Sequence, residues 1–186
     1  MPCNKTTYLL QEYFSEDLAP LAKNKIEVIE GEAFFRTDGS VEIIATGQVI
    51  RSKNTIISTG SRPRNIPVLP VDGVRIINSR EALEERNLPD TIAIIGAGPT
   101  GMEFADIYSS YGVKVTVIEM QDSVIPNEDI DISKYLEKVL ANKGIEFIVG
   151  TKVTGVIQSD IGSTIQLESD IGQNQISVDK VLVSVG

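Results

Sequence analysis

TIAIIGAGPTGMEFA, residues 91–105, is the part of the sequence that says most about the fold. Its first five residues are mostly β-branched, which predicts a buried strand. Gly96, Gly98 and Gly101 follow in G-x-G-x-x-G spacing and open a run that predicts a helix as far as Tyr111. We therefore expect a tight strand-to-helix turn in which each glycine has a separate function.

This glycine spacing is typical of dinucleotide-binding turns. Gly96 would allow the sharp turn, Gly98 would leave the backbone open to a diphosphate, and Gly101 would let the helix pack close to the strand. Unpaired N–H groups and the helix dipole favour an anion at that helix end. An ordinary strand–turn–helix with three glycines is the alternative.

The next strand supplies an acidic residue that favours the dinucleotide interpretation. Residues 113–118 predict the next strand, which ends at Glu119, 18 residues after Gly101. An acid about 20 residues beyond the turn is typical of one that binds ribose hydroxyls. The carboxylate would repel a 2′-phosphate, and none of the next three residues is basic: Met120, Gln121 and Asp122. The sequence therefore predicts NAD rather than NADP.

Composition excludes several classes of function. The chain has 186 residues and a net charge of −9, so no nucleic-acid surface is expected. No apolar run approaches the ~20 residues of a membrane span, and no signal peptide is visible, so we expect a cytoplasmic protein, or a matrix protein if mitochondrial. There is one cysteine, Cys3, and no histidine. The acidic cluster Glu128, Asp129 and Asp131 is interpreted as helix capping, and no metal site is expected.

The first part of the chain predicts a helix and a β-meander. Residues 6–23 carry apolar side chains at helical spacing, and residues 26–57 contain short β-type runs separated by turns. Prolines in residues 63–70 predict a stiff, extended connection.

Elements on both sides of the glycine turn complete the α/β pattern. Ser79 is expected to cap a short helix. A second helix is expected after Asp129, and its apolar face would consist of Ile132, Tyr135, Leu136, Val139 and Leu140. Residues 145–149 predict a third parallel strand and residues 180–186 a last strand. Between them, a meander is expected over residues 153–157, 163–167 and 175–178.

Taken together, the order of motifs resembles that of the FAD-dependent pyridine nucleotide–disulfide oxidoreductases. The motifs that carry the resemblance are IEGEA (29–33), IISTGSRP (56–63), IIGAGPTGME (94–103), VTVIE (115–119), TKVTG (151–155) and VLVSVG (181–186). The resemblance implies a partial FAD domain over residues 1–69, with a helix and an antiparallel meander. It implies an NAD-binding, Rossmann-like domain over residues 70–186, with a parallel sheet, helices on both faces and a β-meander.

The resemblance also implies which residues touch each cofactor. For the diphosphate and nicotinamide of NAD they are Gly96, Ala97, Gly98, Pro99, Thr100, Gly101, Met102 and Glu103. Glu119 would bind the adenosine ribose, Val153 would lie near the adenine, and Gly186 near the nicotinamide end. The FAD contacts would be Ala33, Thr59, Gly60 and Ser61, although composition alone favours a strand end and linker at the last three. Ala33 stands where the family often has glycine.

Other family motifs are absent from these residues. The FAD-binding G-x-G-x-x-G, the C-x4-C redox pair and the His–Glu base do not occur, so the chain resembles an internal part of such an enzyme. We expect no catalytic residue and no turnover from the chain alone. Expected partners are a small-molecule dinucleotide, a second copy in a homo-oligomer and, for members acting on lipoyl groups, lipoyl-bearing complexes. A soluble transhydrogenase, NADH oxidase, mercuric reductase or stand-alone nucleotide-binding module are the alternatives.

Overall fold

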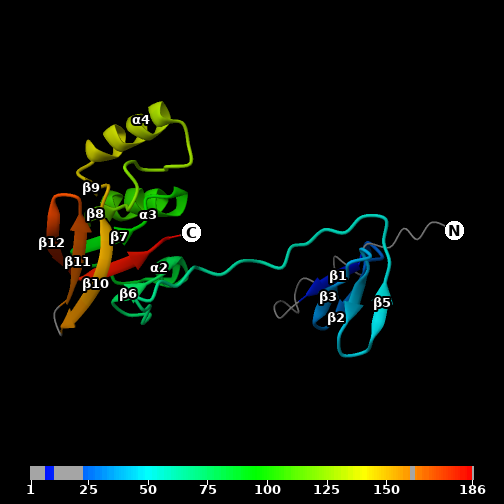
Figure 1. The fold of residues 1–186 in the computed structure, drawn as a ribbon. Helices are drawn as coiled ribbons and strands as arrows, with labels where there is room; N and C mark the ends of the chain where they lie inside the picture. Colours follow the sequence, from blue (N-terminus) through cyan, green and yellow to red (C-terminus); the bar gives the residue numbers. More distant parts are fainter. Residues whose placement is uncertain (1–6, 11–22, 160–161, 186) are drawn as a thin grey trace. The chain divides into compact units, whose positions relative to one another are not determined.

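The computed structural model describes residues 7–10, 23–159 and 162–185 of the chain. The chain divides into two compact units, residues 1–61 and residues 62–186, and each is described by itself (Figure 1).

The proline-rich segment belongs to the second unit. Residues 62–69, which the sequence groups with the first part, fall within this unit because Leu69 is fully buried there, in a cluster with Ile76 and Ala93. The Leu69 N–H donates to the Ile66 carbonyl oxygen at 3.1 Å. The segment therefore contributes Leu69 to a core and is not only a connection. The assignment of the first unit to an FAD domain stays a prediction.

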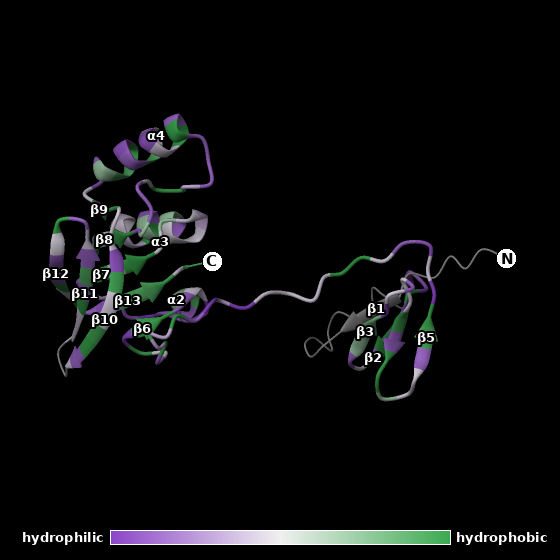
Figure 2. Ribbon diagram, in the orientation of Figure 1, coloured by the Kyte–Doolittle hydropathy of each residue, from purple (hydrophilic) through white to green (hydrophobic). Residues whose placement is uncertain are grey.

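A five-stranded parallel sheet is the centre of the second unit. Its order is β6-β13-β7-β8-β9, with the bounds β6 (Ile76–Ile77), β13 (Lys180–Val183), β7 (Thr91–Ile95), β8 (Lys114–Ile118) and β9 (Glu146–Ile148). After their first residues, strands β7 and β13 are hydrophobic, as expected of strands covered on both faces (Figure 2). The chain runs from β7 through β8 to β9 on one side, and β13 pairs with the other side of β7. The strand order therefore reverses between β7 and β13.

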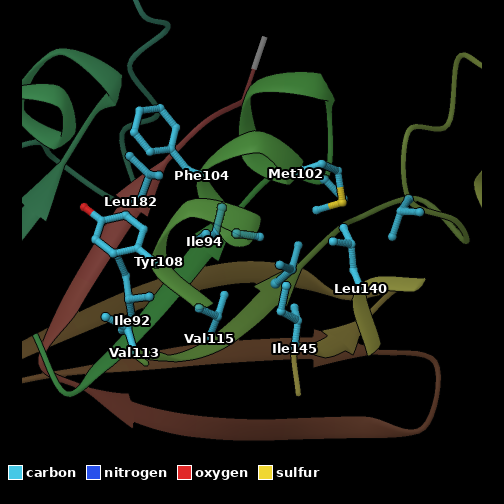
Figure 3. Close-up of a cluster of buried hydrophobic side chains, with 14 of the residues drawn as sticks. Ile92, Ile94, Met102, Phe104, Tyr108, Val113, Val115, Leu140, Ile145 and Leu182 are labelled. Atoms are coloured by element: carbon cyan, nitrogen blue, oxygen red, sulfur yellow. The ribbon is translucent and has the colours of Figure 1, made fainter. Parts of the chain in front are cut away.

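Helices cover one face of this sheet. They are α2 (Ser79–Glu84), α3 (Pro99–Ser110) and α4 (Ile130–Ala141). Met102, Phe104 and Tyr108 of α3 pack against Ile92 and Ile94 of β7 (Figure 3). The helix predicted to end at Tyr111 does end there, since Tyr111 is its C-cap and Gly112 has φ +85°.

A β-meander covers the other face. It consists of β10 (Lys152–Ser159), β11 (Gly162–Ser169) and β12 (Gly172–Val178) in antiparallel order. Its buried side chains meet those of the sheet in one cluster, which includes Val153, Ile165, Leu167, Val178, Ile95 and Val183. The expectation of helices on both faces is corrected here, because the described helices pack into the opposite core cluster.

Helix caps differ slightly from the predictions. Asn78, not Ser79, is the N-cap of α2, because the Asn78 side chain accepts from Arg80 N at 2.8 Å and Glu81 completes a capping box. Asp129 caps α4 by accepting from Asp131 N at 2.8 Å, which confirms the expected capping function of this acidic residue.

Fewer of the apolar residues of α4 face the core than the sequence predicts. Ile132 and Tyr135 are 57% and 70% exposed, whereas Leu140 is buried and Leu136 packs against the core. The helix packs beside the edge strand β9, so only one strip of its surface meets other side chains. Ser133, a polar residue, lies in that strip and is 1% exposed.

An ion pair joins the end of α2 to β13. Lys180 Nζ contacts Glu85 Oε2, and both side chains are mostly buried. The hydrogen bond from Lys180 lowers the pKa of Glu85.

Two small sheets form the described part of the first unit. β1 (Thr7–Leu10) and β2 (Glu27–Glu30) are parallel, and β3 (Ala33–Phe35), β4 (Val41–Ile43) and β5 (Gln48–Ile50) form the expected antiparallel meander.

Two predictions in this unit are wrong. The helix over residues 6–23 is contradicted at Thr7–Leu10, where the chain pairs as a strand, and residues 11–22 lie outside the described residues. The strand at residues 54–57 is absent from the described structure, where Ile56 is 90% exposed with no strand beside it. A short apolar run does not itself specify its pairing partner, and this explains both errors.

No helix in the described ranges is long and apolar enough to cross a membrane.

Replacing Leu69 tests whether the proline-rich segment is part of the second core. We expect Leu69→Ala to lower the free energy of unfolding by about 2–4 kcal/mol, since a buried leucine leaves a cavity when truncated. Urea unfolding followed by circular dichroism measures the change. The control is Val68→Ala at the neighbouring, 39% exposed position, which should change stability far less. Equal effects would show that the segment does not contribute to the core.

Candidate functional site

The glycine turn lies where the strand order of the parallel sheet reverses. Gly96 leaves β7 with φ +102°, and its N–H donates to the Ile118 carbonyl oxygen at 2.8 Å. An added Cβ would lie 3.0 Å from the Ser184 carbonyl oxygen, beyond the end of β13. Crevices at such reversals, at the carboxyl ends of parallel strands, are where ligands bind in open α/β sheets.

Gly101 brings α3 against β7. An added Cβ at this position would lie 2.0 Å from the Gly96 carbonyl oxygen, a distance that no side chain tolerates. The structural functions expected of Gly96 and Gly101 are therefore confirmed.

Gly98 is different, because its surroundings are open. It is the N-cap of α3, with φ −71° and no heavy atom within 4 Å of an added Cβ. Pro99 occupies the first helical position, and both Pro99 and Thr100 are exposed. The geometry leaves room for a ligand beside the backbone of Gly98.

The helix end presents unpaired donors to that space. Met102 N donates to the Gly98 carbonyl oxygen at 3.0 Å, which is the first hydrogen bond of the helix. Within the described part of the chain, the N–H groups of Gly98, Thr100 and Gly101 have no backbone acceptor. Such groups, together with the helix dipole, attract a phosphate or carboxylate.

Glu119 lies against the turn. Its Oε2 accepts from Ala97 N at 2.8 Å, and its Oε1 accepts from Gln121 N at 2.9 Å. Because each carboxylate oxygen has two lone pairs, both oxygens retain capacity for ribose hydroxyls. Met120 is 65% exposed beside it, and none of the three residues after Glu119 is basic. The structure thus brings together the glycine turn and Glu119, which the sequence predicted to act on one ligand.

Two further contacts hold the turn, and the sequence did not indicate either. Ser184 Oγ lies 3.0 Å from the Ile95 carbonyl oxygen and 2.9 Å from that of Gly96, so its hydroxyl joins the ends of β13 and β7. Ile125 N donates to the Ala97 carbonyl oxygen at 2.7 Å. Ile125 has φ +37°, which β-branched residues rarely adopt, and no sequence signal predicts it.

The other predicted contacts are placed as follows. Ala97 and Met102 are buried, and the Met102 side chain packs in the core (Figure 3), so only backbone is left for a ligand there. Glu103 is exposed on α3, and Val153 is buried between the sheet and the meander. Gly186 lies outside the described residues. The predicted FAD contacts Ala33, Thr59, Gly60 and Ser61 are exposed residues of the first unit.

Comparison with known proteins agrees with this geometry. The family model for pyridine nucleotide-disulphide oxidoreductases matches residues 10–186. The chain is 46% identical over 136 residues to the dihydrolipoyl dehydrogenase of Bacillus subtilis (strain 168), covering 72% of this chain and 29% of that enzyme. It is 36% identical over 173 residues to the dihydrolipoyl dehydrogenase of Acholeplasma laidlawii, covering 89% and 49%.

A solved structure shows the same fold. The crystal structure of LpdA from Mycobacterium tuberculosis superposes with a TM-score of 0.71 at 27% identity, over 91% of this chain and 38% of that one. The α/β fold class predicted from the sequence is thereby confirmed. This chain spans less than half the length of each of these three relatives. The chain belongs to the pyridine nucleotide-disulphide oxidoreductase family.

Proposed function

We propose that the second unit binds NAD(H) at the glycine turn, with the diphosphate at the N-terminus of α3 and the adenosine ribose at Glu119. The observation that carries this proposal is the open space at Gly98, bordered by unpaired N–H groups and by the Glu119 carboxylate. The donors match the negative charge of a diphosphate, and the carboxylate matches ribose hydroxyls. Val153 near the adenine and Gly186 near the nicotinamide complete the proposed contacts.

The carboxylate also supports a preference for the unphosphorylated cofactor. A 2′-phosphate next to Glu119 would meet a like charge, and neither Met120 nor Gln121 supplies a cation to offset it.

We further propose that this chain is the NAD-binding portion of an enzyme most similar to dihydrolipoamide dehydrogenase, which oxidises dihydrolipoamide to lipoamide and reduces NAD+. The names of the relatives at 46% and 36% identity support this reading. In such an enzyme FAD and NAD supply the electron-transfer chemistry, while the protein binds and orients them. Ala33, Thr59, Gly60 and Ser61 would form part of the FAD site, and homo-oligomers and lipoyl-bearing complexes would be the partners.

Two alternatives remain distinguishable. A soluble transhydrogenase, NADH oxidase or mercuric reductase would share this NAD-binding portion, and a stand-alone nucleotide-binding module would lack redox chemistry altogether. Sequencing the gene on both sides of these residues distinguishes an enzyme of the family from a stand-alone module. A flanking FAD motif and redox cysteine pair would support the enzyme, and stop codons on both sides would support the module.

The binding proposal is tested by titrating the chain with NADH and comparing Gly98→Ala with the unchanged protein. The backbone of Gly98 permits alanine, and its Cβ would meet nothing in the protein, so folding should be retained. The methyl group would occupy the diphosphate space and weaken NADH binding by roughly ten-fold, equivalent to about 1.4 kcal/mol. Fluorescence of bound NADH measures the affinity, and circular dichroism measures the fold.

Gly101→Ala is the contrasting variant, because its Cβ would collide with the Gly96 carbonyl and destabilise the unit itself. The proposal fails if the folded, unchanged chain does not bind NADH at about millimolar concentration.

Cofactor preference is tested by combining Glu119→Ser with Met120→Arg. Removing a repelling carboxylate and adding a cation should shift the ratio of NADPH to NADH affinity by roughly ten-fold or more towards NADPH. Glu119→Ser alone should produce only part of the shift. If the ratio does not move in the double variant, Glu119 is not at the ribose.

We expect these residues alone to have no dihydrolipoamide or diaphorase turnover, even with added FAD. Disulfide exchange needs a thiolate and a resolving partner, and the chain has only Cys3 and no histidine. Monitoring NADH absorbance with and without FAD measures the activity. Sustained oxidation that depends on FAD would contradict the expectation and show a more complete flavin site.

A further inference from the structure

Ser133 is a buried serine whose hydroxyl is committed to one backbone carbonyl. It lies on α4 with 1% of its surface exposed, and its Oγ donates to the Val124 carbonyl oxygen at 2.6 Å. Val124 belongs to the segment between β8 and α4 and is itself fully buried. The contact therefore joins α4 to the backbone that leads away from Glu119.

That carbonyl shares a peptide group with the donor that holds the glycine turn. A peptide group contains the C=O of one residue and the N–H of the next. The Val124 C=O accepts from Ser133, and the Ile125 N–H of the same group donates to the Ala97 carbonyl oxygen at 2.7 Å.

The Ala97 carbonyl in turn shares a peptide group with the Gly98 N–H, which is one of the unpaired donors at the turn. The hydrogen bonds therefore run in one direction, from the Ser133 hydroxyl through two peptide groups to the Gly98 N–H. Each bond in such a chain polarises the next and strengthens the final donor.

The geometry of the middle peptide group depends on its surroundings. Ile125 has φ +37° and precedes Pro126, and both β-branching and a following proline disfavour a left-handed backbone. The Ile125 carbonyl oxygen accepts from Glu128 N at 2.9 Å, so hydrogen bonds hold the residue on both sides. A strained conformation persists only where its surroundings fix it, and the Ser133 hydrogen bond is one of those that do.

We propose that Ser133 is a positioning residue for the dinucleotide diphosphate, acting through the 124–125 and 97–98 peptide groups on the Gly98 N–H. This inference rests on the proposed binding of NAD(H) at the glycine turn. Ser133 does not touch the ligand. It fixes the direction of the Gly98 N–H and increases its strength as a donor.

The test compares three variants at Ser133 with a control at another buried serine. Ser133→Ala and Ser133→Cys remove or weaken the donor, and Ser133→Thr retains a hydroxyl. Ser163→Ala is the matched control, because Ser163 is also 1% exposed and lies on β11 in the meander layer, where its hydroxyl has no partner among the described residues. All four are made in the full chain.

Two quantities are measured for each variant. One is the dissociation constant for NADH. The other is the chemical shift of the Gly98 amide proton, recorded by NMR without cofactor. A general loss of stability would not move this shift selectively.

We expect Ser133→Ala to weaken NADH binding roughly three-fold to ten-fold, in the range of one lost hydrogen bond. Its Gly98 amide proton should shift upfield, and by more than the amide protons of β8 shift. Ser133→Cys should act in the same direction, Ser133→Thr should restore both quantities, and Ser163→Ala should change neither. If Ser133→Ala does not fold, the Cys and Thr variants decide the question by the same two measurements.

The proposal is overturned if the Gly98 amide is unaffected in folded Ser133→Ala or Ser133→Cys. It is also overturned if NADH affinity falls equally in Ser163→Ala. Failure of the binding proposal has a different signature, since the unchanged chain would then not bind NADH at all, while the Gly98 amide would still report whether the hydrogen-bond chain exists.

Discussion

The close approach of α3 to β7 is the constraint on which the rest of the second unit depends. It is possible only because Gly101 has no side chain, since a Cβ there would lie 2.0 Å from the Gly96 carbonyl oxygen. That approach seats Met102, Phe104 and Tyr108 on the sheet and forms the core on that face. The same approach directs the first N–H groups of the helix towards the reversal between β7 and β13. The absence of a side chain at Gly101 thus permits both the packing of α3 on the sheet and the position of its N–H groups at the candidate site.

Backbone atoms, more than side chains, make up this site. The groups offered to a diphosphate are peptide N–H groups, and the Glu119 carboxylate accepts a hydrogen bond from the Ala97 N–H of the turn. Peptide dipoles have fixed positions only when the chain around them is fixed. Both backbone groups of Ala97 are fixed in this way: its N–H donates a hydrogen bond to Glu119, and its C=O accepts one from the Ile125 N–H. A site of this kind is organised by its neighbours and can be altered by residues that never meet the ligand.

The two units differ in how well they bury their apolar residues. The second has continuous clusters on both faces of its parallel sheet. The first exposes Phe34, Phe35 and Ile56 by 58%, 49% and 90%. Apolar surface of this kind favours contact with other protein.

The strand, turn and helix around the glycines could be predicted from the sequence, because each depends on local chemistry. That chemistry is the β-branched residues in β7, the glycines in the turn, and Gly112 after the helix. The sequence also placed Glu119 at the end of β8, since parallel strands of similar length bring their carboxyl ends to one edge.

The tertiary structure determines which elements pack against each other. It turned Ser133 inwards and Ile132 outwards on α4, paired Thr7–Leu10 as a strand, and placed a meander on one face of the sheet. It also set Ile125 in a left-handed backbone conformation that its own residue type opposes. These features depend on contacts between residues far apart in the chain, and such contacts leave no periodic or local signal from which the sequence could predict them.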